Sequence, residues 1–145
     1  MIEPGACRVY TARTMTEHFE ELVELSRIAT RCDPWVRQAG LTGYCAELKG
    51  EVDEALAAIA KNDIENLREE LGDIFLDLSR LCALAEDAGH FRIEDVLAGV
   101  VEKVKRRQPF LLDNRAVTIE EALDYWNTAK AAEKGRSSGL DQAAR

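Results

Sequence analysis

Two helix-forming segments joined by a very short turn constrain the fold of this chain more than any other feature of its sequence. Residues 44–61 and 64–88 both carry apolar side chains at helical spacing, and only Asn62 and Asp63 stand between them. Helices connected by so short a turn pack antiparallel. The sequence therefore predicts a helical hairpin at the centre of the fold.

The remaining chain is also predicted to be helical. No stretch shows the sustained alternation of apolar and polar residues that is typical of a strand. Sequences that fit capping boxes begin at Thr14 and Thr118, and Pro109 ends a basic helical segment. We expect an all-α fold of about five helices, with additional helices over 15–31, 93–107 and 119–134 and a connecting loop over 33–43.

Length and composition bound the domain organisation and the class of protein. A chain of 145 residues forms one domain by length, which we place over 14–134, between an N-terminal extension over 1–13 and a polar tail over 135–145 that we predict to be disordered. The N-terminus lacks the apolar segment of a secretory signal, and the longest apolar run, 55–60, is too short to span a membrane. Because the four cysteines form no CxxC pair, we expect a cytoplasmic protein with reduced thiols.

The acidic charge of the chain is concentrated in the predicted hairpin. The net charge is −8, and residues 41–90, with 12 acidic and four basic residues, account for all of it. This balance argues against non-specific nucleic-acid binding, which requires a positive surface. At about 100° per residue the acids form one stripe beside the apolar face of each helix. The first stripe contains Glu47, Glu51 and Glu54, and the second contains Glu70, Asp73 and Asp77.

Two interpretations of these acidic stripes stay open on spacing alone: a solvated helix edge or a metal site. A solvated edge more often alternates acidic and basic residues, whereas each stripe has almost no compensating lysine or arginine. A divalent cation would relieve the repulsion, and oxygen-only ligands favour Mg²⁺, with Mn²⁺ as a substitute, over iron or zinc. A ferritin-like iron site is not expected, because it needs Glu-x-x-His on two helices and the chain has no such sequence.

Basic residues near the end of the segment 93–107 indicate a phosphate site. Lys103, Arg106 and Arg107 share one helical face. Trp126 and Lys130 share a face of the last predicted helix. Compensation of the helix dipole explains basic residues at a helix C-terminus as well, and a tryptophan at such a position is often a core residue. Together with a metal, however, cations and an aromatic ring are the groups that a nucleoside triphosphate needs.

Taken in order, these motifs resemble those of MazG-type nucleoside triphosphate pyrophosphohydrolases. The family signature is ExxE followed by ExxD, which here reads Glu51-Val-Asp-Glu54 and, after fifteen intervening residues, Glu70-Leu-Gly-Asp73. The segments EDVLAGVVEKVKRRQPF and DYWNTAK also resemble parts of the family, so that the resemblance covers about residues 17–134.

The resemblance implies a fold, an activity and a set of site residues. The implied fold is all-α, with chains paired into a homodimer or homotetramer and the central antiparallel helices forming a four-helix-bundle-like core on dimerisation. The implied activity is Mg²⁺-dependent hydrolysis of nucleoside triphosphates, including damaged or modified ones, to nucleoside monophosphate and pyrophosphate. The implied metal ligands, which also serve catalysis, are Glu51, Glu54, Glu70 and Asp73, with Glu47 and Asp77 as candidate extra ligands. The expected substrate-binding residues are Lys103, Arg106, Arg107, Trp126 and Lys130.

Two other functions stay open at this point. One is a narrower pyrophosphatase of the same superfamily, specific for dUTP or dCTP. The chain departs from the usual family pattern at an inserted Asp33 and at Val36, Gly50 and Gln108, where many members carry an acid, a glutamate and a histidine, and these departures leave the base preference open. The other is a non-catalytic helical module that binds nucleotides or a partner protein. The intact pair of acidic motifs argues against the second function, because a scaffold gains nothing from unpaired acids beside its core.

Overall fold

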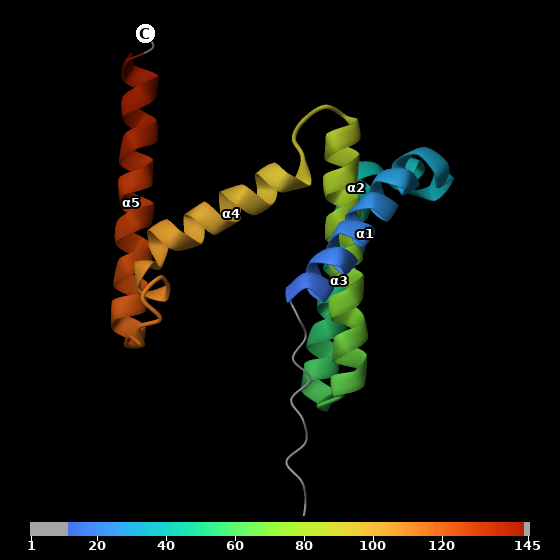
Figure 1. The fold of residues 1–145 in the computed structure, drawn as a ribbon, viewed down its shortest axis with the longest axis horizontal. Coiled ribbons are helices and arrows are strands. Elements are labelled where there is room, and N and C mark those ends of the chain that lie inside the picture. The colour runs from blue at the N-terminus through green and yellow to red at the C-terminus, as the bar shows by residue number, and fades with distance from the viewer. Residues whose placement is uncertain (1–11, 144–145) are drawn as a thin grey trace, which may run out of the picture. The chain divides into compact units, whose positions relative to one another are not determined.

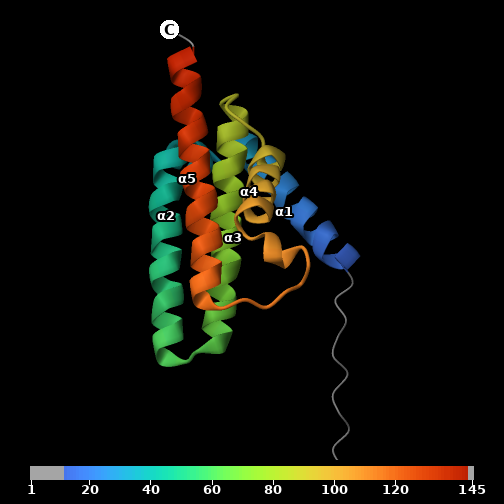
Figure 2. The same ribbon diagram turned by 90° about the vertical axis from the view of Figure 1, so that its left-hand side faces the viewer.

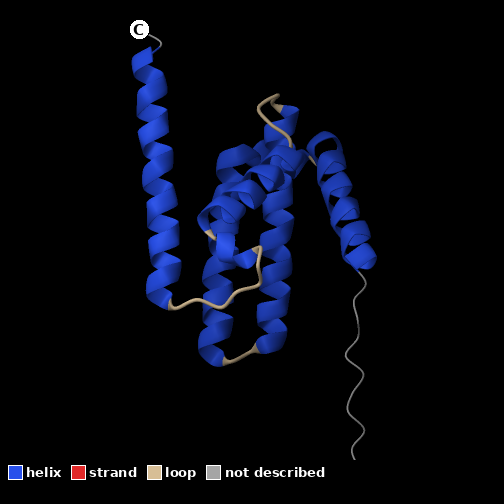
Figure 3. Ribbon diagram, turned by 60° about the vertical axis from the view of Figure 1, so that its left-hand side comes forward, coloured by secondary structure: helices blue, strands red, loops and turns tan. Residues whose placement is uncertain are grey.

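The computed structural model describes residues 12–143, which fall into two compact units, one up to Ile93 and one from Glu94 onward. All regular elements within this described range are helices, which confirms the predicted all-α class (Figure 1, Figure 3). The helices are α1 (Ala12–Cys32), α2 (Pro34–Lys61), α3 (Ile64–Asp87), α4 (Ile93–Arg107), the 3₁₀ helix η1 (Pro109–Leu111) and α5 (Ile119–Ala143). No helix in this part of the chain has the length and apolar content needed to cross a membrane.

Helices α2 and α3 form the predicted antiparallel hairpin, with the two helices side by side in Figure 2. Asn62 ends α2 in the left-handed conformation, with φ of 53°, and its N–H donates to the carbonyl groups of Ala58 and Ile59. Asp63 caps α3, because its side chain accepts a hydrogen bond from the N–H of Asn66 at 3.1 Å. Helix α1 packs mainly on α3 and less on α2. The hairpin and α1 thus make up the first unit.

The predicted connecting loop over residues 33–43 is wrong, because α2 already begins at Pro34. Asp33 caps the helix by accepting a hydrogen bond from the N–H of Trp35 at 2.9 Å, and proline is well tolerated at the first helical position. The helix is interrupted at Gly40, where φ is 60° and ψ is −168°. The sequence Asp-Pro therefore starts a helix here, and the change of direction comes at the glycine.

Three helix ends can be compared with the prediction. Helix α1 begins at Ala12, so Thr14 lies within the helix and not at its N-terminus, where the sequence predicts it. The box at α5 is confirmed: the N–H of Thr118 donates to Glu121 Oε2 at 2.8 Å, and the N–H of Glu121 donates to Thr118 Oγ1 at 3.2 Å. Helix α5 continues to Ala143, so residues 135–143 of the expected disordered tail are helical. Residues 1–11 of the expected N-terminal extension lie outside the described range.

The apolar stripe of the hairpin is largely exposed, although the helical spacing predicted it as the core face. Val52, Leu56 and Ile59 of α2 are 42–59% exposed. The corresponding residues of α3, Leu71, Phe75 and Leu78, are 44–56% exposed. Small residues of α2 and polar residues of α3 are buried instead: Ala55, Ala58, Glu70, Asp77 and Ser79. The two helices therefore meet along their small and acidic edges, and these apolar side chains remain partly exposed among residues 12–93.

Replacing Gly40 by alanine should destabilise the protein, because the backbone conformation at this position is one that essentially only glycine adopts. No atom lies within 4 Å of the Cβ that a substitution would add, so backbone strain is the only cost. We expect the free energy of unfolding to fall by roughly 1–3 kcal/mol in urea titrations. Gly50→Ala, in the regular part of the same helix, should raise it by up to about 1 kcal/mol. Equal effects of both changes would contradict a strained backbone at Gly40.

Candidate active site

The hairpin brings together three of the four carboxylates of the ExxE and ExxD motifs. Three carboxylate oxygens lie within 4.8 Å of one another, one each from Glu51 in α2 and from Glu70 and Asp73 in α3. Glu70 is buried, with only 6% of its surface exposed, and Glu51 is half-buried. Glu70 and Asp73 share one face of α3 because they lie three residues apart, and the antiparallel hairpin places Glu51 opposite them. The two motifs and the short turn therefore bring these three carboxylates, the carboxylate cluster, to the same part of the hairpin.

The charge of the carboxylate cluster is not compensated by the protein. Within residues 12–143, neither Glu51, Glu70 nor Asp73 forms an ion pair with a lysine or arginine. Burial, the negative charges of Glu54 and Asp73, and a side-chain hydrogen bond with Glu70 raise the pKa of Glu51 to about 7. The cluster thus holds its charges only at a free-energy cost. A bound divalent cation would remove this cost, so the donor set fits Mg²⁺ or Mn²⁺.

The other predicted ligands occupy the margins of the carboxylate cluster. Glu54 is exposed and lies outside the group of three, although its charge raises the pKa of Glu51. Asp77 is buried, and burial together with the nearby acids Glu47 and Asp73 raises its pKa, against an opposing effect of Arg80. Asp77 and Glu47 therefore lie near each other, at the border of the cluster.

A tyrosine and an arginine that the sequence analysis did not single out lie close to Asp77. Tyr44 of α2 is 2% exposed, and its hydroxyl accepts a hydrogen bond from Arg80 Nη1 at 3.0 Å. The Arg80 guanidinium also lies 5.7 Å from the centroid of the Tyr44 ring, within the range of a cation–π interaction. Arg80 is one of only two basic residues in α3, with Arg68, and it follows Asp77 by three residues, which was the available signal in the sequence. Tyr44 holds this cation beside the border of the carboxylate cluster.

Four of the five predicted substrate-binding residues come together in the second unit, at the end of α4 and along α5. The guanidinium carbon of Arg107 lies 4.7 Å from the centroid of the Trp126 ring. Arg106 and Arg107 both form ion pairs with Glu133, at 3.0 Å and 2.7 Å. Trp126 is thus neither a plain core residue nor an open stacking platform, because a guanidinium covers one face of its ring.

A hollow of about 340 Å³ adjoins these arginines and has a mainly basic lining. The lining residues are Arg107, Lys130, Glu133 and Lys134. Lys103 is exposed and does not line the hollow. Glu133 and Lys134 were not predicted, but Glu133 lies seven residues after Trp126 and three after Lys130, so helical spacing on α5 would have indicated that it shares their face. Three cations around one carboxylate make this hollow suitable for phosphate oxygens.

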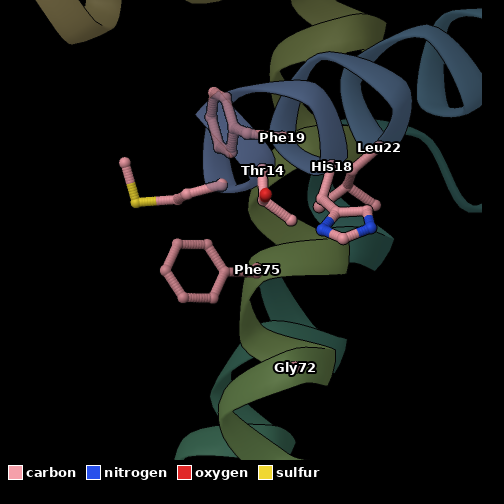
Figure 4. A pocket seen from close by; sticks show the side chains of 7 residues that line it. Thr14, His18, Phe19, Leu22, Gly72 and Phe75 are labelled. Atoms are coloured by element: carbon pink, nitrogen blue, oxygen red, sulfur yellow. The ribbon is translucent and has the colours of Figure 1, made fainter. Parts of the chain in front are cut away.

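An apolar hollow of about 530 Å³ lies between α1 and α3 (Figure 4). Its lining residues are Thr14, Met15, His18, Phe19, Leu22, Gly72 and Phe75. Phe19 of α1 and Phe75 of α3 border it from two sides in Figure 4. Gly72 and Phe75 flank Asp73 in the sequence but lie on another face of α3, so the hollow extends the exposed apolar face and is separate from the carboxylate cluster.

The structure thus defines a class of protein: an all-α domain with a carboxylate cluster on its central hairpin. The model of one family, the MazG nucleotide pyrophosphohydrolase domain, matches residues 40–112, which include the four motif carboxylates and the basic end of α4. The chain therefore belongs to the MazG nucleotide pyrophosphohydrolase domain family. Trp126, Lys130 and Glu133 lie beyond the matched range.

Several relatives share most of this chain. It is 34% identical over 110 residues to a nucleoside triphosphate pyrophosphohydrolase of Mycobacterium tuberculosis, covering 74% of this chain and 34% of the relative. It is 31% identical over 116 residues to one of Escherichia coli K12, covering 77% of this chain and 44% of the relative. The chain thus spans less than half the length of either curated relative. The crystal structure of a MazG-related protein from Thermotoga maritima has a TM-score of 0.71 and 31% identity, covering 77% of this chain and 98% of that one.

The pKa of Glu51 predicts a fall in the stability of the metal-free protein with rising pH. The unfolded chain releases this proton near the ordinary pKa of 4.5, whereas the folded protein keeps it up to about 7. Because the folded state binds more protons between these values, its free energy of unfolding decreases as the pH rises through this window. Thermal unfolding in the presence of EDTA, followed by circular dichroism, should show the fall.

Glu51→Gln should remove a large part of this pH dependence. Asp53→Asn, which alters an exposed carboxylate of the same helix, is the matched control and should leave the dependence as it is. The assignment to Glu51 is wrong if Glu51→Gln and wild-type protein lose the same amount of stability between about pH 4.5 and about pH 7.

Proposed function

We propose that this chain hydrolyses nucleoside triphosphates to nucleoside monophosphate and pyrophosphate with the help of Mg²⁺. The observation that carries the proposal is the convergence of Glu51, Glu70 and Asp73, whose carboxylate oxygens lie within 4.8 Å of one another. The printed names of the Mycobacterium tuberculosis and Escherichia coli relatives support the activity. The net charge of −8 supports an enzyme that acts on free nucleotides and does not bind nucleic acid. The proposal also includes a cytoplasmic location, no membrane association, and damaged or modified triphosphates among the substrates.

In this proposal the carboxylate cluster holds the metal. Glu51, Glu70 and Asp73 bind Mg²⁺ or its substitute Mn²⁺, and the exposed Glu54 completes the set of ligands from the two motifs. Mg²⁺ suits such a site because it prefers carboxylate oxygens together with water and substrate phosphates. When bound, the cation polarises a phosphate oxygen and neutralises charge that develops during hydrolysis. Without the cation, the raised pKa of Glu51 lets a proton occupy the cluster up to about pH 7, and binding of the cation would displace that proton.

The basic group of the second unit supplies the cations that a triphosphate requires. Arg107 and Lys130 line the 340 Å³ hollow, and Arg106 is held beside Arg107 through Glu133. Guanidinium groups bind phosphate oxygens through paired N–H donors, and ammonium groups bind them as point charges. We assign the exposed Lys103, one turn before Arg107, to the same function. Trp126 orients the Arg107 guanidinium through its ring face.

The proposed reaction is tested by incubating the protein with a panel of ribo- and deoxynucleoside triphosphates, including an oxidised purine triphosphate, in the presence of Mg²⁺. We expect nucleoside monophosphate and pyrophosphate as products, because the reaction breaks the bond between the α- and β-phosphates. Turnover confined to dUTP or dCTP would identify the narrower pyrophosphatase. Nucleoside diphosphate with orthophosphate, or no turnover of any triphosphate, would contradict the proposal.

Substitution of the motif carboxylates tests whether they are needed for activity and not for folding. Glu54→Gln and Asp73→Asn should each lower turnover by more than about 100-fold, because each removes a negatively charged oxygen from the metal site. The helical circular dichroism of both variants should match that of the wild type. Asp53→Asn, between Glu51 and Glu54 in sequence, should keep full activity. If both motif variants stayed active, the assignment of the metal ligands would be wrong.

We further propose that two copies of the chain pair through the exposed apolar face of the hairpin. This face runs along both α2 and α3 and includes Leu56, which is 59% exposed, and Phe75, which is 56% exposed. Pairing two antiparallel hairpins through such faces produces a four-helix bundle. A two-fold arrangement suits this face, because it lets the same surface of each copy contact its counterpart. A homodimer, or a homotetramer built from two such dimers, then buries the stripe that the sequence predicts as core.

Static light scattering coupled to gel filtration measures this association. The wild type should elute with the mass of a dimer or tetramer, and Leu56→Glu should elute as a monomer because it places a charge within the apolar face. Leu25→Glu on α1 is the matched control, since Leu25 is 56% exposed and lies outside the hairpin. A wild-type protein with the mass of one chain would contradict the proposed pairing.

A further inference from the structure

Glu133 is the residue around which the basic group of the second unit is organised. Its Oε2 accepts a hydrogen bond from Arg107 Nη2 at 2.7 Å, and its Oε1 accepts from Arg106 Nε at 3.0 Å. Arg107 Nε lies 3.5 Å from the same Oε1, so the carboxylate spans one edge of the Arg107 guanidinium. One carboxylate from α5 thus connects two consecutive arginines at the end of α4.

Arg107 is fixed on two sides. Glu133 takes its Nε–Nη2 edge, and the Trp126 ring covers one face of the guanidinium at 4.7 Å. The side chain of Arg107 is only 13% exposed, whereas that of Arg106 is 51% exposed. No hydrogen bond within the described part of the chain uses Arg107 Nη1. The guanidinium is therefore held in one orientation with donor capacity left over, and it lines the hollow that also contains Lys130 and Lys134.

The two arginines keep Glu133 charged. Hydrogen bonds from Arg107 and then Arg106 lower the pKa of Glu133 to about 2. The carboxylate therefore stays ionised at any pH at which the protein is used. An ionised carboxylate between two guanidinium groups offsets their mutual repulsion, and without it the two neighbouring cations would separate into solvent.

We propose that Glu133 is a positioning residue for phosphate binding: it holds Arg107 against Trp126 so that the guanidinium presents its free donors to phosphate oxygens in the hollow. This inference rests on the proposed function, in which the hollow receives phosphate groups of the substrate. Although Glu133 is acidic, it favours phosphate binding in this proposal. Arg107 is already held in place, so it loses less conformational entropy when the phosphate binds. Glu133 acts through Arg107 and does not itself contact the phosphate.

The experiment compares Glu133→Gln with Glu120→Gln, which removes the same charge from an exposed position on α5. Calorimetric titration with inorganic pyrophosphate is the first readout, since it reports on the hollow without requiring turnover. The proposal predicts that Glu133→Gln weakens pyrophosphate binding roughly five- to tenfold and raises KM similarly with little change in kcat. Glu120→Gln should bind pyrophosphate as the wild type does.

A double-mutant cycle shows whether Glu133 acts through Arg107. In an Arg107→Ala background, Glu133→Gln should cause no further loss of pyrophosphate binding, because the group that it positions is missing.

Tighter binding by Glu133→Gln would overturn the proposal, since the carboxylate would then only compete with phosphate. Unchanged binding with a lower melting temperature would overturn it in favour of a purely structural ion pair, and so would an undiminished effect in the Arg107→Ala background. Wild-type protein that binds pyrophosphate but hydrolyses no triphosphate would refute the proposed reaction alone.

Discussion

The close approach of like charges between α2 and α3 is the constraint on which the rest of the structure depends. Ala55 and Ala58 are small enough for the two helices to meet, and their contact encloses Glu70 and brings Glu51 next to Asp73. Such an arrangement opposes folding unless a proton or a cation compensates it. The raised pKa of Glu51 is one form of that compensation, and a bound divalent cation is the other. Under the proposed function, the hairpin gives up some folding stability in return for a metal site.

The second unit also brings like charges together, but these charges are positive. Arg106 and Arg107 follow each other directly, and their repulsion is offset by Glu133 and by the ring of Trp126. Each unit therefore contains a group of like charges, but only the basic group carries its own counter-charge. An acidic chain can bind a polyphosphate under these conditions, because local groups of charge, and not the net value of −8, decide what binds.

The features that could be predicted from the sequence are those that neighbouring residues determine. Asn62 and Asp63 end one helix and begin the next, and Thr118 with Glu121 forms the expected capping box. The start of α2 was missed because Asp33-Pro34 is compatible with both a loop and a helix N-terminus, and only the tertiary arrangement decides between them.

Features that depend on packing between distant segments could not be predicted in full. Spacing placed all the acids beside an apolar stripe, but the rotation of α2 against α3 decides that Glu51 joins the carboxylate cluster and Glu54 does not. The same rotation leaves Leu56 exposed, although helical spacing makes it a core residue. The contact of Glu133 with α4 depends on how α5 packs, which no local pattern encodes.

The central claim is that the converging carboxylates form a metal site, and direct titration with Mn²⁺ tests it. Electron paramagnetic resonance measures free Mn²⁺, so it reports binding without any assumption about the substrate. The account predicts that wild-type protein takes up Mn²⁺, that Mg²⁺ displaces it, and that Glu70→Gln weakens the binding by at least about tenfold. Equal Mn²⁺ affinity in the wild type and in Glu70→Gln would contradict it.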